Sequence, residues 1–340
     1  MARRHGKWSF RWPERRCLGR CDDGIHLILM KVSILIARSR GAALMLALWA
    51  LFLLSAMVIS WALDINSRLT LSGNANRVLG AEAMASSGAD VALHPTIKPG
   101  SPNLHGKMGD RESYDVRMTG ECGRLNLNLL APGGAENQGL VKILRQYLNL
   151  KGIELNDLDT MMDSLLDWVS PSQGLHRLNA PPESDDYHPA HAPLTSVDDL
   201  KKVFGWGDFT SKPGWDEDFT INSCQKIDLA WASRDVLRAL GVGDNLVDRF
   251  LQLRRGPDGI DGTADDAQFN DLNDALTRGL GLNAQQISAL QAQAPVGFKD
   301  QPIFRILSVG KSGDVTRSVE MVVQKQTGIS LPQLISWKEL

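Results

Sequence analysis

Residues 38–63 read RSRGAALMLALWALFLLSAMVISWAL, and no charged side chain occurs between Ala42 and Leu63. A run of about 22 residues is long enough to cross a bilayer, because a hydrocarbon core of roughly 30 Å needs about 20 helical residues. Three basic residues, Lys31, Arg38 and Arg40, precede the run. Positive charge on this side predicts a cytoplasmic N-terminus, so the sequence indicates a single-pass anchor with an extracytoplasmic body.

The charge of that body is acidic. The chain has 37 Lys and Arg and 39 Asp and Glu in total, but residues 1–40 hold ten of the basic and three of the acidic residues. Everything after Gly41 therefore has a net charge of about −9. An acidic body disfavours nucleic-acid binding, which needs a basic face.

A removed secretory signal is the alternative to an anchor. Such signals have an apolar region of about 7–15 residues that ends in small residues, whereas this run is longer and contains Trp49 and Trp61. We therefore favour an anchor at residues 42–63, preceded by a leader at residues 1–41. Within the leader, Met1–Leu29 has no periodicity, so we favour Met30 as the true start. An intact cytoplasmic precursor that begins at Met1 would reject this hypothesis.

Helical periodicity continues beyond the apolar run. Small residues recur at helical spacing at Ala75, Val78, Ala81, Ala85, Gly88 and Ala92. His94-Pro95 then predicts the helix end. We expect one helix with residues 42–63 in the membrane and 64–93 outside it, packing on a globular domain. An exposed alanine-rich stripe on this helix would be an interface.

Two segments have the alternation of β-hairpins. In residues 113–130 the turn is Gly120–Gly123, and in residues 219–229 it is Asn222–Gln225. Cys122-Gly-Arg-Leu-Asn-Leu aligns with Cys224-Gln-Lys-Ile-Asp-Leu, and helical sequence follows each copy. We infer a degenerate internal duplication. A third hairpin is predicted for 303–324, followed by a loosely ordered tail at 327–340.

The four cysteines fall into two pairs, one on each side of the predicted membrane segment. Cys17 and Cys21 lie in the cytoplasmic piece, where thiols stay reduced. Cys122 and Cys224 lie outside, and two cysteines allow one intramolecular disulfide. Equivalent turns of equivalent hairpins can lie side by side, so we predict a Cys122–Cys224 disulfide; the alternative is two unrelated buried thiols.

Between Arg38 and Gln326 the chain resembles type IV pilin-like proteins, and among them the K-type minor pseudopilins of type II secretion. The matching motifs are Arg40-Gly41 before Ala42–Trp49, Gly123-Arg-Leu-Asn-Leu-Asn128, Asp163–Trp168, Tyr187, the 195–203 helix and Ile227–Ser233. The chain departs from the family at Val169–Ser172, where further acids are common, and at Asp228–Ala230. The resemblance implies that a prepilin peptidase cleaves between Gly41 and Ala42 and N-methylates Ala42.

The resemblance also implies an α+β fold. After the transmembrane and long N-terminal helix, a pilin-like antiparallel sheet spans residues 94–130 and 219–326. A helical insertion at 131–218 interrupts the sheet, and a second helical module lies at 231–292. The two blocks would be a duplicated SAM-like or helix-hairpin-helix-like module.

Leu46 is a departure with a functional meaning. Most pilin-like subunits have Glu as the fifth mature residue, and here that residue is Leu46. Such a Glu neutralises the N-terminal ammonium of a neighbouring subunit inside lipid, where an unpaired charge is costly. A chain without it cannot dock beneath another subunit in that way. In the family the same absence accompanies a position at the filament tip.

One segment resembles a helix-hairpin-helix, a module that grips DNA phosphates in other proteins. It consists of the Leu240–Gly243 turn before an apolar helix, with Arg238, Arg249, Arg254 and Arg255 nearby. Asp244, Asp248 and Asp258 are close by, and together with the acidic body they favour a packing module.

A second segment is rich in carboxylates. Asp258, Asp261, Asp265 and Asp266 occur within nine residues and are interspersed with glycines. Carboxylates at this density are oxygen ligands for Ca²⁺, although the spacing is not that of an EF-hand. We predict a calcium site here, in keeping with the calcium association of K-type pseudopilins; a flexible Asp/Gly turn is the alternative.

No enzyme signature is present: the seven histidines are scattered, and the chain has no phosphate-binding glycine loop. The sequence predicts a minor pseudopilin of the bacterial inner membrane, with its bulk in the periplasm, that caps a short filament. Expected partners are the I and J minor pseudopilins, the major pseudopilin, the prepilin peptidase and the inner-membrane assembly platform. The alternatives are a membrane-tethered DNA-uptake receptor and a periplasmic enzyme with a plain anchor.

Overall fold

The computed structural model describes residues 40–171, 177–326 and 330–340, in two compact units that divide after Ser72. The leader before Arg40, including Met30, Cys17 and Cys21, lies outside the described residues. One helix, α2 (Arg40–Leu93), begins in the first unit and ends in the second. It is the one helix among the described residues that is long and apolar enough to span a membrane. Its end at Leu93 agrees with the end predicted from His94-Pro95.

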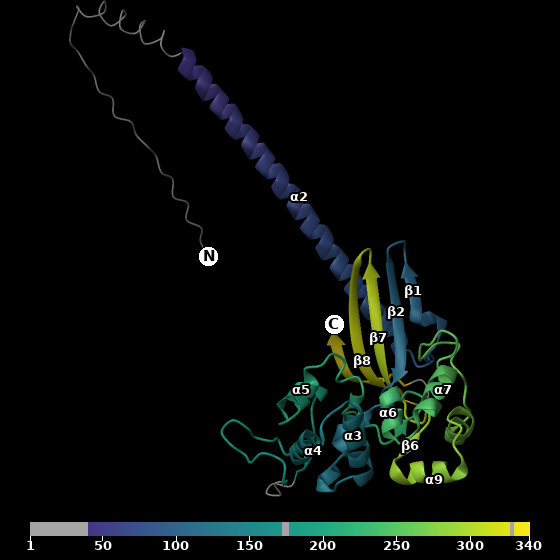
Figure 1. The fold of residues 1–340 in the computed structure, drawn as a ribbon. Helices are drawn as coiled ribbons and strands as arrows, with labels where there is room; N and C mark the ends of the chain where they lie inside the picture. The colour runs from purple at the N-terminus through teal and green to yellow at the C-terminus, as the bar shows by residue number, and fades with distance from the viewer. Residues whose placement is uncertain (1–39, 172–176, 327–329) are drawn as a thin grey trace, which may run out of the picture. The chain divides into compact units, whose positions relative to one another are not determined.

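The second unit contains an antiparallel five-stranded sheet with the order β1-β2-β7-β8-β9 (Figure 1). The strands are β1 (His105–Met108), β2 (Glu112–Gly120), β7 (Ile303–Ser312), β8 (Val315–Gln324) and β9 (Gln333–Glu339). Strand β2, from early in the unit, pairs with β7, from its end. The helical part of the chain is therefore inserted between two neighbouring strands.

Both early hairpin predictions are wrong. A 3-10 turn at Glu121–Gly123 leads the chain out of the sheet after β2. The next strand, β3 (Leu125–Asn126), pairs in parallel with β4 (Phe219–Thr220), and β5 (Ile227–Asp228) pairs in parallel with β6 (Val296–Gly297). These two-residue strands are buried, so their apolar alternation reflects packing in a helical core rather than hairpin pairing.

The inserted helices form two successive blocks. The first contains α3 (Gln138–Leu150), α4 (Leu155–Val169), a 3-10 helix (Val197–Lys202) and α5 (Gly207–Thr210). The second contains α6 (Arg234–Ala239), α7 (Asp244–Arg254), α8 (Leu272–Asp274), a π-helical turn (Ala275–Gly279) and α9 (Ala284–Gln293). Shorter 3-10 turns lie at Pro102–Leu104, Leu127–Leu129 and Pro132–Gly134. Buried aliphatic and aromatic side chains of both blocks form one core.

The predicted duplication has a structural counterpart in these blocks. Each block begins at a two-residue strand and returns to pair with that strand, β3 with β4 and β5 with β6. Asn126 and Asp228 occupy equivalent positions in β3 and β5, and each side chain accepts a hydrogen bond from the backbone N–H two residues on. Asn126 also donates to the carbonyl of Asn222, and Asp228 accepts from the N–H of Lys299. Both partners lie two residues beyond the closing strand.

The β7–β8 hairpin agrees with prediction, but the tail does not. Residues 333–339 form β9, which pairs with β8 in an antiparallel ladder that includes Val323↔Leu334 and Met321↔Trp337. The outer edge of β8 thereby gains a partner for its backbone N–H and C=O groups, which is the physical reason for the added strand. Figure 1 shows the chain end beside β8.

A second core lies between α2 and the sheet, and it corrects the exposed stripe predicted from the sequence. Ala85, Ala89 and Ala92 are fully buried against the strands. The Ser308 hydroxyl on β7 donates to the Ala85 carbonyl at 2.6 Å. At Gly310 an added Cβ would lie 2.1 Å from the Ala81 carbonyl oxygen, so only glycine permits this approach. The small residues serve this close internal packing, and a different face of α2 is exposed.

Candidate assembly site

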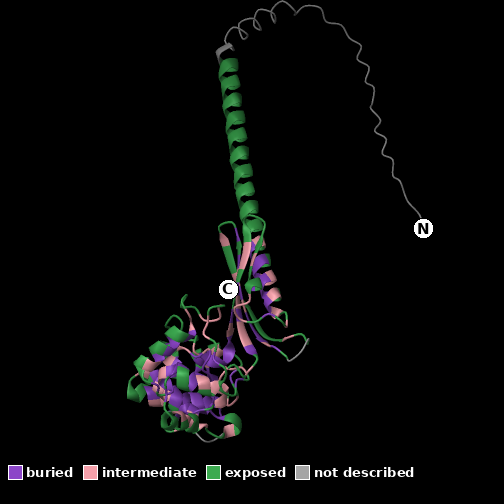
Figure 2. Ribbon diagram, turned by 90° about the vertical axis from the view of Figure 1, so that its right-hand side faces the viewer, coloured by how far each residue is buried: buried purple, intermediate pink, exposed green. Residues whose placement is uncertain are grey.

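The part of α2 that belongs to the first unit is not buried by the rest of the described chain. Every residue from Ala42 to Ser72 is exposed (Figure 2). Gly41 and Ala42 lie in the first turn of α2, and Leu46 is 70% exposed one turn later. An apolar helix of this length without protein around it needs lipid or other helices to cover it.

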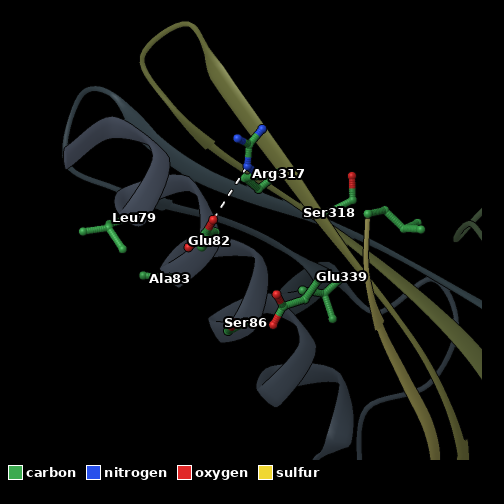
Figure 3. Close-up of a pocket in the computed structure, with 9 residues that line it drawn as sticks. Leu79, Glu82, Ala83, Ser86, Arg317, Ser318 and Glu339 are labelled. Carbon is green, nitrogen blue, oxygen red and sulfur yellow. Dashed lines mark ion pairs between the residues drawn. The ribbon is translucent and has the colours of Figure 1, made fainter. Parts of the chain in front are cut away.

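The exposed face of α2 in the second unit borders a groove of about 460 Å³. The groove is lined by Leu79, Glu82, Ala83, Ser86, Arg317, Ser318, Val319, Glu339 and Leu340. Its two walls are α2 and the β8–β9 edge of the sheet (Figure 3). Arg317 and Glu82 form an ion pair across it, with 3.7 Å between Nε and Oε1.

The junction between sheet and helical blocks contains the cysteine pair. The structure places the sulfurs of Cys122 and Cys224 2.04 Å apart, with 5.2 Å between the Cα atoms, as in a disulfide. The pair lies against Ile303 and Val322 of the sheet. It joins the residues that precede β3 and β5, where the two blocks begin.

A buried carboxylate lies beside this pair, and sequence reasoning missed it. Glu121 is fully buried and accepts hydrogen bonds from Arg305 on β7 (2.8 Å), from Arg124 (2.9 Å) and from the Thr220 hydroxyl (2.6 Å). Burial by itself raises the pKa of Glu121, but the hydrogen bond from Arg305 and the two guanidinium charges outweigh it, so the pKa lies below its ordinary value. Glu121 thus ties the sheet to the first helical block. The sequence signal that could have identified Glu121 is its position as a single acidic residue between β2 and Cys122.

The helix-hairpin-helix geometry is present in α6, a turn with Gly241 at φ +85°, and α7. Two of its arginines pair with acids, Arg234 with Asp248 at 2.7 Å and Arg238 with Asp244 at 2.5 Å, whereas Arg249 is exposed. DNA phosphates would have to displace these carboxylates. The arrangement therefore favours packing over phosphate binding.

The four candidate calcium ligands are not brought together around one point. Asp261 pairs with Arg254 (2.9 Å) and Arg255 (3.0 Å), and Asp266 accepts from the N–H of Gly262. Asp265 accepts from the N–H of Asp258. Among the described residues no three His, Cys, Asp or Glu side chains are placed to hold a metal ion. As arranged, the donor set does not fit calcium, and calcium binding here stays a prediction from the sequence.

Arg254 ties the acidic loop to the second helical block. Its guanidinium is 4% exposed and donates to the carbonyls of Leu229 and Ala232 as well as to Asp261. The loop also touches the sheet domain, because a Cβ added at Gly262 would lie 2.7 Å from the Met118 carbonyl oxygen. The acidic loop is thus a contact between the second helical block and β2.

These features define a class: a pilin-like α+β protein with one apolar helix of membrane-spanning length and a helical insertion in its sheet. No family model and no curated protein matches the chain. Among solved structures, it is similar to a chain of the GspK–GspI–GspJ complex from the type 2 secretion system of enterotoxigenic Escherichia coli. The TM-score is 0.54 at 13% sequence identity, over 82% of this chain and 99% of the other. The fold expected from the resemblance to K-type minor pseudopilins is therefore confirmed.

Proposed function

We propose that this chain is a minor pseudopilin of a type II secretion system, which acts by assembly rather than catalysis. The observation that carries the proposal is the agreement in fold with a chain of the GspK–GspI–GspJ complex over 99% of that chain. The membrane-length helix that continues into the core of a pilin-like sheet supports the same role. The chain would lie in the inner membrane with its N-terminus in the cytoplasm and its bulk in the periplasm.

The position in the filament follows from the anchor. Processing between Gly41 and Ala42, with methylation of Ala42, would place Leu46 where other subunits have Glu. A chain without that carboxylate cannot neutralise the ammonium of a subunit above it, because an unpaired charge in lipid is costly. We propose that it caps the periplasmic pseudopilus and helps initiate its assembly. Its partners would be the I and J minor pseudopilins, the major pseudopilin, the prepilin peptidase and the inner-membrane platform.

The test is co-assembly. The chain, tagged at its C-terminus, is expressed with I- and J-type subunits and a prepilin peptidase, and complexes are purified from detergent-extracted membranes. Recovery of both subunits with the chain supports the proposal, and recovery of neither contradicts it. Binding to a DNA fragment at physiological salt, tested on the same material, would instead support the uptake receptor.

A further inference from the structure

The sheet is wider than the helix that covers it. Val319, Met321 and Val323 on β8 are buried against α2. Their partners on β9 are Glu339, Trp337 and Leu334, and directly paired residues project from the same face of a sheet. Leu334 is 50% exposed and Trp337 is 40% exposed. A helix is about 10 Å wide and strands lie about 4.8 Å apart, so α2 leaves β9 uncovered.

The Glu339 end of this uncovered strip lines a groove with α2, and Trp337 and Leu334 continue the strip along β9 beyond it. Leu79, 63% exposed, and Ala83 line its helix wall, while Ser318 and Glu339 line the sheet wall. In Figure 3 the Glu82–Arg317 pair and the Glu339 carboxylate lie between α2 and the strands. Packed helices lie 8–10 Å apart. A second helix beside α2 would therefore lie over β9 and bury Leu334 and Trp337.

Among the described residues, the groove has an unpaired negative charge, which favours a partner with a basic side chain. Glu82 is paired with Arg317, but no cation pairs with Glu339 within the described parts of the chain. The Glu339 carboxylate is directed toward α2 near Ser86 (Figure 3). A helix that enters the groove brings this carboxylate out of water, which is costly unless the helix supplies a cation.

We propose that the groove between α2 and β9 binds an α-helix of a different pilin-like subunit, through small apolar residues against Ala83 and Trp337 and a Lys or Arg against Glu339. This inference rests on the proposed function and adds the surface and the chemistry of the partner helix. The strand that sequence reasoning took for a tail is one wall of the site. The buried alanine stripe takes no part in it.

The experiment compares two charge reversals on adjacent residues of β9. Glu339→Lys changes the groove, whereas Lys338→Glu changes the opposite face of the same strand, where its partner is Glu320. Each full-length variant is co-expressed with I- and J-type subunits, and affinity for each subunit is measured in detergent micelles. We expect Glu339→Lys to weaken one of the two complexes about tenfold, and Lys338→Glu to change both by less than twofold.

A photo-crosslinking residue in place of Ala83 identifies the occupant in membranes. The expected crosslink is to a helix of the I- or J-type subunit next to a Lys or Arg, and reversing that partner residue to Glu should restore binding to Glu339→Lys. Equal binding by wild type and Glu339→Lys overturns the groove while leaving the proposed function intact. Crosslinks to a second copy of this chain overturn the choice of partner. Failure of wild type to bind either subunit overturns both proposals.

Discussion

Glu121 is the residue on which the junction of sheet and helical blocks depends most. It is fully buried and bound by Arg305 and Arg124. Glu121→Gln removes the anion of the partly buried Arg124 and leaves the partly buried Arg305 with Glu320 as its carboxylate partner. Removing one partner of a buried pair costs about 3–5 kcal/mol, so we expect the free energy of unfolding in urea to fall by about 3 kcal/mol. Glu320→Gln, which removes a more exposed carboxylate from the same Arg305, should cost less than about 1 kcal/mol.

The same carboxylate gives stability a pH dependence. The pKa of Glu121 is lower in the folded protein than its ordinary value of 4.5, so the unfolded chain binds more protons on acidification. The contribution of the Glu121 carboxylate to the free energy of unfolding is complete above pH 4.5, and it is lost as the pH falls through the lower pKa of the folded protein. Urea unfolding at pH 6 and pH 4 should show a smaller loss on acidification in Glu121→Gln than in wild type. Equal losses would mean that Glu121 is not the titrating group.

Lys325 is a basic group that also gives the stability a pH dependence, at alkaline rather than acidic pH. Its ammonium donates to the carbonyls of His94 (3.1 Å) and Ile97 (2.5 Å) just beyond the end of α2. Burial lowers the pKa of Lys325 to about 8 from 10.5. The unfolded chain then binds more protons between these values, so this group makes stability rise with pH across that window. Lys325→Met should abolish the rise, as measured by urea unfolding at pH 8 and pH 10; an unchanged rise would contradict the assignment.

At the scale of elements, the Cys122–Cys224 pair closes a long loop. The two residues are 102 positions apart, and the first helical block lies between them. Crosslinking a loop of about 100 residues is worth about 4.7 kcal/mol in the chain-entropy model. We expect Cys122→Ala/Cys224→Ala to lower the free energy of unfolding by about 3–4 kcal/mol. Dithiothreitol should destabilise wild type by a similar amount and leave the double variant unchanged. Two titratable thiols in the oxidised, processed protein would show that the bond is absent.

The acidic loop is the element where sequence and structure point in different directions. For calcium to bind all four carboxylates, Asp261 would have to leave Arg254 and Arg255. Calcium binding, as the sequence predicts it, requires a higher melting temperature in Ca²⁺ than in EGTA, with the difference removed by Asp258→Asn/Asp265→Asn. Equal melting temperatures would reject the calcium prediction and leave the arginine pairs as the means of neutralising the loop.

Local patterns predicted local elements and failed for distant pairings. The end of α2 and the β7–β8 hairpin depend on neighbours in sequence, and both were found. Strands β3 and β5 have two residues each and pair with segments about 95 and 70 positions away, so alternation could not identify their partners. Strand β9 follows Pro332 closely and exists because β8 offers an edge.

The candidate sites follow the same division. The cysteine pair was found through the duplication, which aligns the residues before β3 and β5. The sequence did not reveal that Glu121 and Arg254 are buried and hold the structure together, because the partners of a charged side chain are visible only in the folded structure. The alanine stripe has the periodicity of a helix interface, but the sequence could not tell that its partner is the chain's own sheet.

At the scale of the whole molecule, the chain has one apolar helix of membrane length and a pilin-like α+β body. The fold agrees with a chain of a solved secretion complex at 13% identity, so fold persists where sequence gives little guidance. The role in assembly rests on the first residues of α2. Under the proposed function, cleavage there would convert a leader-bearing precursor into a subunit whose helix begins at Ala42.

The most direct test is the N-terminal sequence of the chain extracted from membranes of cells with and without a prepilin peptidase. We predict a mature protein that begins with N-methylated Ala42 when the peptidase is present, and the intact leader when it is absent. The same uncut N-terminus in both strains would contradict the assignment as a pseudopilin and favour a protein with a plain membrane anchor.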